Sequence, residues 1–249
     1  MTAYKDPIPV LTLVETGSTN AEARSRAEAG EAGPLWITAR RQTAGRGRRG
    51  RVWEDGGGNL AATLLMTTSL PPARAAQVSF VAALAVGDLT DHCLGKAAAR
   101  LKWPNDVLVE GKKVSGILVE SGARPDGLLW LAVGIGVNLA TPPPTPDRPA
   151  AALAEFLSSQ APSQADAMAI LNQTFDHWLS KWMSNGFDPI ARAWTDRAHG
   201  LGQACTAQLG HTTIEGIAEG LDPDGALRLR LADGTIACIS AGDVFFGEA

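Results

Sequence analysis

Four short apolar segments follow one another between residues 101 and 139, and they constrain the fold more than any other part of the chain. They have the length and composition of β-strands and cover residues 101–103, 106–109, 113–120 and 128–139. The sequence EGK at 110–112 predicts a tight hairpin between the second and the third. Strands joined by a hairpin are antiparallel, so we expect a mixed sheet and not an all-parallel one.

Helical and strand-like patterns alternate around this region, which predicts an α/β (α+β) fold with a mixed sheet packed against helices. Further strands are expected at 10–14, 35–39 and 59–67. Helices are expected after residue 20, ending near Gly30, and at roughly 73–93, 164–185 and 189–198. Five prolines within residues 141–149 exclude regular structure there and predict a stiff connector.

The pattern changes at about residue 201, where short strands become separated by glycine turns, two of them Asp-Gly. These strands are expected at 206–209, 212–219, 226–231 and 235–239. Short alternating strands with Asp-Gly turns are typical of a small antiparallel barrel. We therefore expect two domains, residues 1–200 and residues 201–249.

Positive charge is concentrated in one short stretch of an acidic protein. Six arginines and three glycines lie within residues 40–51, which contain no acid, whereas the other 237 residues hold 16 basic and 26 acidic side chains. Such a loop can close over a phosphate or a carboxylate. An arginine-rich nucleic-acid tract or a solvated charged loop fits the stretch equally well, although a pI near 5.6 disfavours a constitutive nucleic-acid binder.

Composition excludes several classes of protein. The sequence has no run of the roughly 20 apolar residues that a membrane helix needs, and residues 1–9 lack the apolar segment of a secretory signal. The three cysteines have no CxxC spacing and the four histidines are scattered, so neither a disulfide framework nor a metal cluster is predicted. We expect a cytoplasmic protein with no membrane partner.

Residues at strand ends are candidates for ligand contacts. In KWPND at 102–106, Pro104 forces a turn that projects Asn105 and Asp106 from the strand ends. Asp106 could bind magnesium through an oxygen, and Asn105 could contact a base or ribose. An ordinary Asn-Asp turn explains the same two residues.

Three further features have both a functional and a structural interpretation. Lys113 begins the apolar strand KVSGILVE, where it could face an anionic substrate or simply reach solvent beside the hairpin. The two glycines of GIGVN at 134–138 permit close approach of a ligand or of another backbone. Ser18-Thr19-Asn20 precedes the first helix and also fits a plain helix cap.

Together, these motifs occur in an order and spacing that resemble the biotin–protein ligases, the BirA family. They are STN at 18–20, GRGRRG at 45–50, KWPND at 102–106, KVSGILVE at 113–120 and GIGVN at 134–138. The resemblance extends over nearly the whole chain, and EGLDPDGAL at 219–227 fits that family's small SH3-like C-terminal β-barrel domain. It implies an enzyme that joins biotin and ATP into biotinoyl-5′-AMP and then transfers biotin to a lysine of a biotin carboxyl carrier protein.

The resemblance also implies a role for individual residues. Lys113, Arg48 and Arg46 would be catalytic, and Asp106 would contact Mg²⁺. The residues implied in biotin binding are Ser18, Thr19, Asn20, Gln42, Arg46, Gly47, Arg48, Lys113 and Gly116. The residues implied in adenylate and ATP binding are Arg48, Arg51, Trp53, Lys102, Asn105, Asp106, Lys113, Gly134 and Asn138, with Gly136 letting the ligand lie flat on the sheet.

Some members of that family carry an N-terminal winged helix that represses the biotin operon. Only 17 residues precede Ser18 here, so we expect a monofunctional ligase with no DNA partner. A homodimer is compatible with the resemblance.

Three other functions fit part of the pattern. A lipoate or octanoate ligase or transferase has a similar fold, but it would not need the polar STN cluster. An enzyme that forms a nucleotidyl-lysine at Lys113 fits K-x-x-G, although Ser115 stands where DNA and RNA ligases have aspartate. An RNA-binding module could use the arginine–glycine loop alone.

Overall fold

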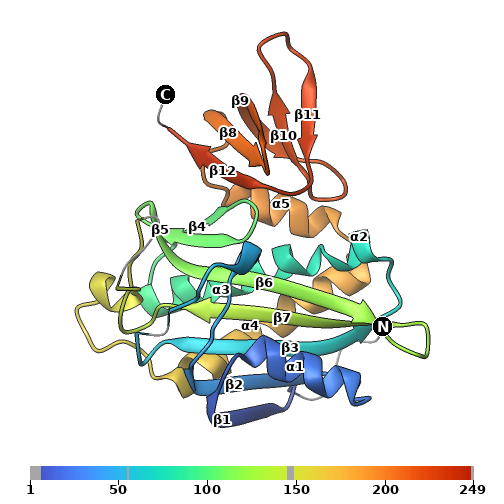
Figure 1. Ribbon diagram of the computed structural model, residues 1–249. Helices are drawn as coiled ribbons and strands as arrows, with labels where there is room; N and C mark the ends of the chain where they lie inside the picture. Colours follow the sequence, from blue (N-terminus) through green and yellow to red (C-terminus); the bar gives the residue numbers. More distant parts are fainter. Residues whose placement is uncertain (1–6, 55, 145–148, 248–249) are drawn as a thin grey trace.

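The computed structural model describes residues 7–54, 56–144 and 149–247 (Figure 1). Two expectations lie partly outside the described residues. They concern the absence of a secretory signal in residues 1–9, of which 1–6 are not described, and the proline-rich connector at 141–149, of which 145–148 are not described.

A seven-stranded sheet forms the centre of the molecule, in the order β1-β2-β3-β7-β6-β5-β4. β1 and β2 are parallel and the other neighbouring pairs are antiparallel, so the expected mixed sheet is confirmed. The predicted hairpin joins β5 to β6, with left-handed φ angles of 50° at Glu110 and 77° at Gly111. The strands are β1 (Val10–Thr16), β2 (Leu35–Gln42), β3 (Leu60–Thr68), β4 (Ala99–Lys102), β5 (Asp106–Val109), β6 (Lys112–Ala123) and β7 (Leu129–Val137).

Helices cover both faces of this sheet because successive strand residues point to opposite sides. Trp36 and Leu64 belong to the large core beneath α3 (Val78–Leu94), α4 (Gln164–Asn185) and α5 (Asp188–Asp196). The next residue on each strand, Ile37 and Leu65, belongs to a small second core with Ala23 and Ala27 of α1 (Thr19–Glu28). Figure 1 shows α1 in front of the sheet and α3 and α4 behind it. The described helices include none that is both long and apolar enough to cross a membrane.

The helix expected at 73–93 is interrupted near its start. A four-residue helix, α2 (Pro72–Ala75), precedes α3, and Gln77 lies between them. Gln77 is buried, and its Nε2 donates a hydrogen bond of 3.3 Å to the carbonyl of Pro223. This contact between residues distant in sequence occurs where the local pattern predicted one continuous helix.

Residues beyond 200 form a second, antiparallel sheet in the order β11-β10-β9-β8-β12. Its strands are β8 (Ala204–Leu209), β9 (Thr212–Leu221), β10 (Leu227–Arg230), β11 (Ile236–Ile239) and β12 (Asp243–Phe246). The expected antiparallel unit is confirmed, but the described strands form an open sheet with β11 and β12 at its edges. β12 was not predicted, because its four residues follow a short glycine turn without an alternating pattern.

The C-terminal sheet packs directly on the larger part of the molecule. Its buried residues Cys205, Leu229 and Val244 belong to the same contiguous core as α3 and the main sheet. The indole Nε1 of Trp103 donates a hydrogen bond of 3.1 Å to the carbonyl of Gly225. The domain boundary near residue 200 stays a prediction.

Candidate active site

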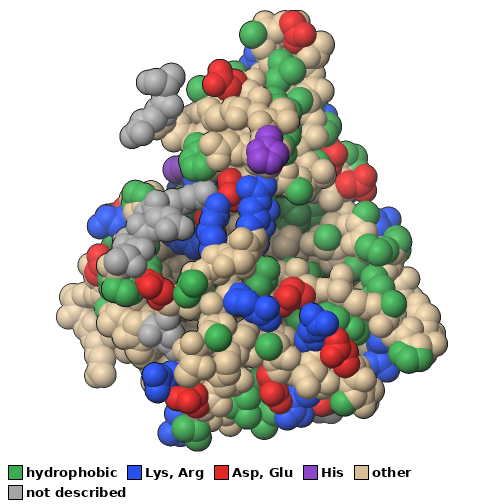
Figure 2. Space-filling model, viewed as in Figure 1, with side chains coloured by type: hydrophobic (Ala, Val, Ile, Leu, Met, Phe, Trp, Pro, Cys, Tyr) green, Lys and Arg blue, Asp and Glu red, His purple; other side chains and the backbone are tan. Residues whose placement is uncertain are grey.

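A cavity of about 510 Å³ lies over the main sheet where β6 and β7 meet the arginine-rich loop and β12. Figure 2 shows Lys and Arg side chains gathered on the face beneath the C-terminal sheet. The lining includes most of the residues named from the sequence: Ser18, Thr19, Asn20, Gln42, Arg46, Gly47, Arg48, Arg51, Trp53, Asn105, Asp106, Lys113, Gly116, Gly134, Gly136 and Asn138.

One end of the cavity is polar and nearly closed to solvent. Ser18, Thr19 and Asn20 are buried at the start of α1. The backbone N–H of Thr19 donates a hydrogen bond of 2.8 Å to Oε1 of Gln42, which fixes the loop against the helix. In the described structure the hydroxyl of Ser18 makes no capping hydrogen bond, so plain helix capping does not account for it.

The amide of Asn20 is held in one orientation by neighbouring strands. Its Nδ2 donates hydrogen bonds to the carbonyl of Leu118 at 3.3 Å and to Oε2 of Glu120 at 2.7 Å. Its Oδ1 lies 2.7 Å from the hydroxyl of Thr63, which is fully buried. Thr63 was not singled out from the sequence, because it is a lone polar residue within a strand pattern, and Glu120 was part of the KVSGILVE motif but was given no role in the site.

The floor of the cavity is made of glycines that leave room for side chains above them. A Cβ on Gly134 would lie 2.1 Å from Oδ1 of Asn20, and one on Gly136 would lie 2.3 Å from the Trp53 ring. Gly136 pairs with Gly116 on β6, where a Cβ would lie 3.1 Å from both Trp53 and Lys113. Gly134 and Gly136 are two residues apart on β7 and are therefore separated by roughly 7 Å. The cavity thus has two ends along β7, one at Gly134 and the other at Gly136.

Lys113 lies at the second end, beside the KWPND turn. Its Nζ is 2.6 Å from a carboxylate oxygen of Asp106, which is only 6% exposed. The same Nζ lies 5.8 Å from the centre of the Trp53 ring. Asn105 is oriented by a hydrogen bond of 2.7 Å from its Nδ2 to the carbonyl of Ile117. A fixed ammonium group therefore lies directly beside the glycine floor.

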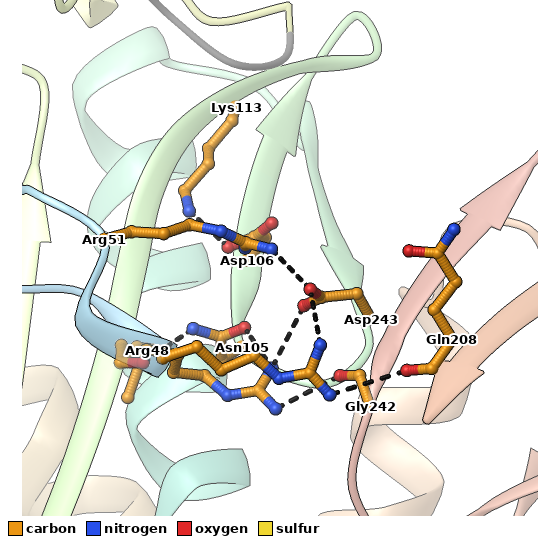
Figure 3. Close-up of polar contacts among 10 residues, drawn as sticks. Arg48, Arg51, Asn105, Asp106, Lys113, Gln208, Gly242 and Asp243 are labelled. Atoms are coloured by element: carbon orange, nitrogen blue, oxygen red, sulfur yellow. Dashed lines mark hydrogen bonds and ion pairs between the residues drawn. The ribbon is translucent and has the colours of Figure 1, made fainter. Parts of the chain in front are cut away.

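The arginine-rich loop turns over this end and reaches the C-terminal sheet (Figure 3). Arg48 donates hydrogen bonds to Oδ1 of Asn105 at 3.2 Å and to the carbonyl of Gly242 at 3.1 Å. Arg49 and Arg51 both form ion pairs with Asp243, the first residue of β12. Asp243 was missed because nothing in the sequence places a lone acid, some 190 residues away, beside this loop.

Burial lowers the pKa of the Arg48 guanidinium, while the nearby carboxylate of Asp243 opposes that shift. Arginine still stays protonated at physiological pH. An anionic ligand stabilises a partly desolvated cation of this kind more strongly than it stabilises an exposed cation. The loop geometry thus favours a compact anion beside Lys113.

Lys102 does not line the cavity, whereas Asn105 and Asp106 of the same KWPND motif do. Its Nζ is 6.0 Å from the ring centres of Phe245 and Phe246 on β12. This placement was not predicted because β12 itself was not predicted.

The described residues do not form a complete magnesium site. They fit a magnesium ion only if phosphate oxygens of a ligand supply its other contacts. Among them, no group of three or more His, Cys, Asp or Glu side chains is placed to hold a metal. Asp106 already pairs with Lys113, and Asp243 with the arginines. Mg²⁺ commonly takes one or two protein carboxylates together with substrate phosphates, and Asp106 can supply one such oxygen.

Comparisons with known proteins show the family to which the chain is similar. A model described as the biotin/lipoate A/B protein ligase family matches residues 16–138, and the biotin protein ligase C terminal domain matches residues 200–247. A biotin--[acetyl-CoA-carboxylase] ligase of Paracoccus denitrificans is 43% identical over 242 residues, which cover 94% of this chain and 99% of that protein. The bifunctional ligase/repressor BirA of Bacillus subtilis is 33% identical over 215 residues, which cover 85% of this chain and 66% of that protein.

A solved structure has the same architecture from end to end. Biotin protein ligase from Aquifex aeolicus, in complex with biotin and ATP, aligns with a TM-score of 0.80 at 26% identity, covering 99% of this chain and 100% of that one. The chain belongs to the biotin protein ligase family.

Proposed function

We propose that this protein is an ATP-dependent biotin–protein ligase. It joins biotin to ATP, releases pyrophosphate, and transfers biotin from biotinoyl-5′-AMP to a lysine of a biotin carboxyl carrier protein. The observation that carries the proposal is a single cavity with a buried polar end and a cationic end, both resting on one glycine floor.

The polar end suits the ureido ring of biotin. That ring has two N–H donors and one carbonyl acceptor, so it needs both kinds of partner in a fixed arrangement. The hydroxyls of Ser18 and Thr19 and the oriented amide of Asn20 supply them, and Gln42 holds Thr19 in place. Buried polar groups of this type reject ligands that leave them unpaired.

The cationic end suits the first chemical step. A carboxylate oxygen of biotin attacks the α-phosphorus of ATP, and pyrophosphate leaves as the new acyl–phosphate bond forms. Two anions must approach each other, so nearby cations lower the barrier by offsetting their repulsion and the charge that develops at phosphorus. Lys113 is the ammonium beside the floor, and Arg46 and Arg48 of the loop line the same cavity.

Trp53 and its glycine neighbours provide a surface for the nucleotide. The indole lies over Gly116 and Gly136, and Asn105 is oriented beside it. Aromatic faces stack on bases, and the arginine loop above would keep water from the mixed anhydride. Mg²⁺ would be held by Asp106 together with the phosphates and would add positive charge at the leaving group.

The second step needs access for a carrier lysine. Its amine attacks the acyl carbon of biotinoyl-5′-AMP, an amide bond forms, and AMP leaves with the bonding electrons. The cavity opens beside the exposed loop residue Val52, which is 74% exposed. This open side is where a carrier domain could present its lysine.

The alternatives account for less of the geometry. An aliphatic acid such as lipoate has no ureido ring to exchange hydrogen bonds with the hydroxyls and amide at the polar end. An RNA-binding role is disfavoured because Arg48, Arg49 and Arg51 are engaged with the C-terminal sheet.

ATP–pyrophosphate exchange tests the first step. We expect exchange with biotin and little with lipoate or octanoate. Exchange that is equal with lipoate would support the alternative ligase, and a stable AMP adduct on Lys113 would support a nucleotidyl-lysine enzyme.

A further inference from the structure

The tip of the arginine-rich loop is tied to the rest of the protein mainly through charge. Within the loop, short backbone contacts close a small turn, such as the bond of 2.8 Å from the N–H of Gly47 to the carbonyl of Arg51. The neighbouring Val52 is 74% exposed, so apolar packing does not hold this side of the loop. Trp53 anchors the stem instead, because its ring lies over the glycine floor.

Asp243 provides the contact at the tip (Figure 3). It is 3% exposed and begins β12, where it pairs with Gln208 of β8 and is therefore fixed by the C-terminal sheet. Its Oδ2 accepts hydrogen bonds from Arg49 at 3.1 Å and from Arg51, and its Oδ1 lies 3.8 Å from Arg48. One carboxylate thus holds together three guanidinium groups that otherwise repel one another.

Arg49 differs from its neighbours because it does not line the cavity. Arg48, Gly50 and Arg51 line the cavity, whereas Arg49 does not. Its backbone has φ 56° and ψ 31°, a left-handed conformation that is unfavourable for a residue with a side chain. Such a conformation persists when surrounding contacts hold it, and the Arg49 side chain makes an ion pair with Asp243 and a hydrogen bond of 3.5 Å to the carbonyl of Gln208.

We propose that Asp243 is a positioning residue for adenylate formation. Through Arg49 and Arg51 it ties the loop to the C-terminal sheet, and this keeps Arg48 beside Asn105 and Lys113. The inference rests on the proposed ligase function for its kinetic consequence, but the tether itself can be measured without any substrate.

Limited trypsin digestion measures the tether directly, since the loop is rich in cleavage sites. Asp243→Asn and Asp243→Ala keep every arginine of the loop, and Asp224→Asn changes an exposed acid in the turn between β9 and β10 as the matched control. Loss of a charge-assisted contact should speed cleavage in residues 46–51 by about tenfold or more, while the control is cleaved like the wild type. Peptide mapping identifies the cleaved bonds.

Kinetics then separate positioning from general destabilisation. We expect both Asp243 variants to raise the KM for ATP by about tenfold and to release biotinoyl-5′-AMP faster, with the KM for biotin changed less than about twofold. A merely structural defect would lower kcat through a smaller active fraction and leave both KM values unchanged.

Arg49→Ala provides a second route to the same contact, because the Arg49 side chain is 42% exposed and its loss does not open the core. Combined with Asp243→Asn, it should add little to the effect of Asp243→Asn alone, because that change already removes the ion pair of Arg49 together with those of Arg48 and Arg51. If Asp243→Asn fails to fold, Arg49→Ala decides the question by the KM for ATP and by cleavage after Arg46, Arg48 and Arg51, which it retains.

Protection of the loop and a KM for ATP that both stay at the wild-type level in folded variants would overturn the proposal. Should the wild-type protein show no biotin-dependent exchange, the ligase function fails, and the digestion still reports whether Asp243 holds the loop.

Discussion

The ammonium of Lys113 lies 2.6 Å from the carboxylate of Asp106, and the two residues come from neighbouring strands on either side of one hairpin. The ion pair holds the lysine side chain against the sheet, beside the floor formed by Gly116 and Gly136. A charge fixed before the substrate binds costs no reorganisation when the reaction begins. This arrangement explains why a lysine on so apolar a strand is suited to a reaction between two anions.

Lys113→Ala should therefore abolish adenylate formation. Removing one preorganised electrostatic contact typically lowers kcat by about 10²- to 10³-fold, and we expect at least that loss in biotin-dependent pyrophosphate exchange. Lys112→Ala is the control, because Lys112 is exposed on the same hairpin and lies 4.0 Å from Glu155. Equal exchange rates in the two variants would remove Lys113 from the mechanism.

Arg48→Ala should weaken retention of biotinoyl-5′-AMP more than it slows its formation. The guanidinium bridges Asn105 and Gly242, so its loss opens the loop over the nucleotide end. We expect the adenylate to dissociate about tenfold faster or more, measured by release of labelled intermediate from a preformed complex. Arg41→Ala is the control, since Arg41 is exposed and pairs with Glu15 at 2.9 Å. A dissociation rate that is the same in both variants contradicts this role.

Two alanine substitutions should separate the two ends of the cavity. In Gly134→Ala the new methyl would displace Asn20 and raise the KM for biotin, and in Gly136→Ala it would displace Trp53 and raise the KM for ATP. Displacements of this size commonly lower kcat/KM by about 10- to 100-fold. Gly17→Ala is the control, because no described atom beyond its chain neighbours lies within 4 Å of the added carbon. If both variants changed the same KM, the division into two ends would be wrong.

Much of the fold could be predicted from local patterns. The hairpin at EGK and the alternating elements around it predicted the mixed sheet, and short strands with glycine turns predicted the C-terminal unit. Local propensity did not predict β12, which is held by its pairing with β8, or the break before α3, where Gln77 contacts Pro223.

The candidate residues that lie in compact motifs could be named from the sequence, and these motifs meet at one cavity. Lone residues that depend on distant parts of the chain were not predictable. Thr63 and Glu120 orient Asn20, and Asp243 orients the arginines, through contacts across 43 to 194 positions. Each of these residues is ordinary in its local sequence.

The interface between the two sheets should weaken in mild acid. His199 is partly buried beside Phe246, and burial together with the positive charge of Lys102 lowers the pKa of its imidazole. Because the folded-state pKa lies below the unfolded value, the unfolded chain takes up the proton first as the pH falls. This residue's contribution to stability is therefore present above about pH 6.5 and is lost as the pH falls through the folded-state pKa.

Urea unfolding at about pH 7.5 and about pH 5.5 tests this expectation. His199→Gln should lose less free energy of unfolding between the two pH values than the wild type does. The matched control is His211→Gln at an exposed turn between β8 and β9. An unchanged pH dependence in His199→Gln would show that this imidazole does not contribute.

The central claim is that one cavity activates biotin with ATP for transfer to a protein lysine. Its most direct test is the incorporation of labelled biotin into a purified biotin carboxyl carrier domain, with ATP and Mg²⁺ present and with each omitted in turn. The account predicts label on one carrier lysine, dependent on ATP and absent with Lys113→Ala. Labelling that proceeds without ATP, or no labelling by folded wild-type protein, would contradict it.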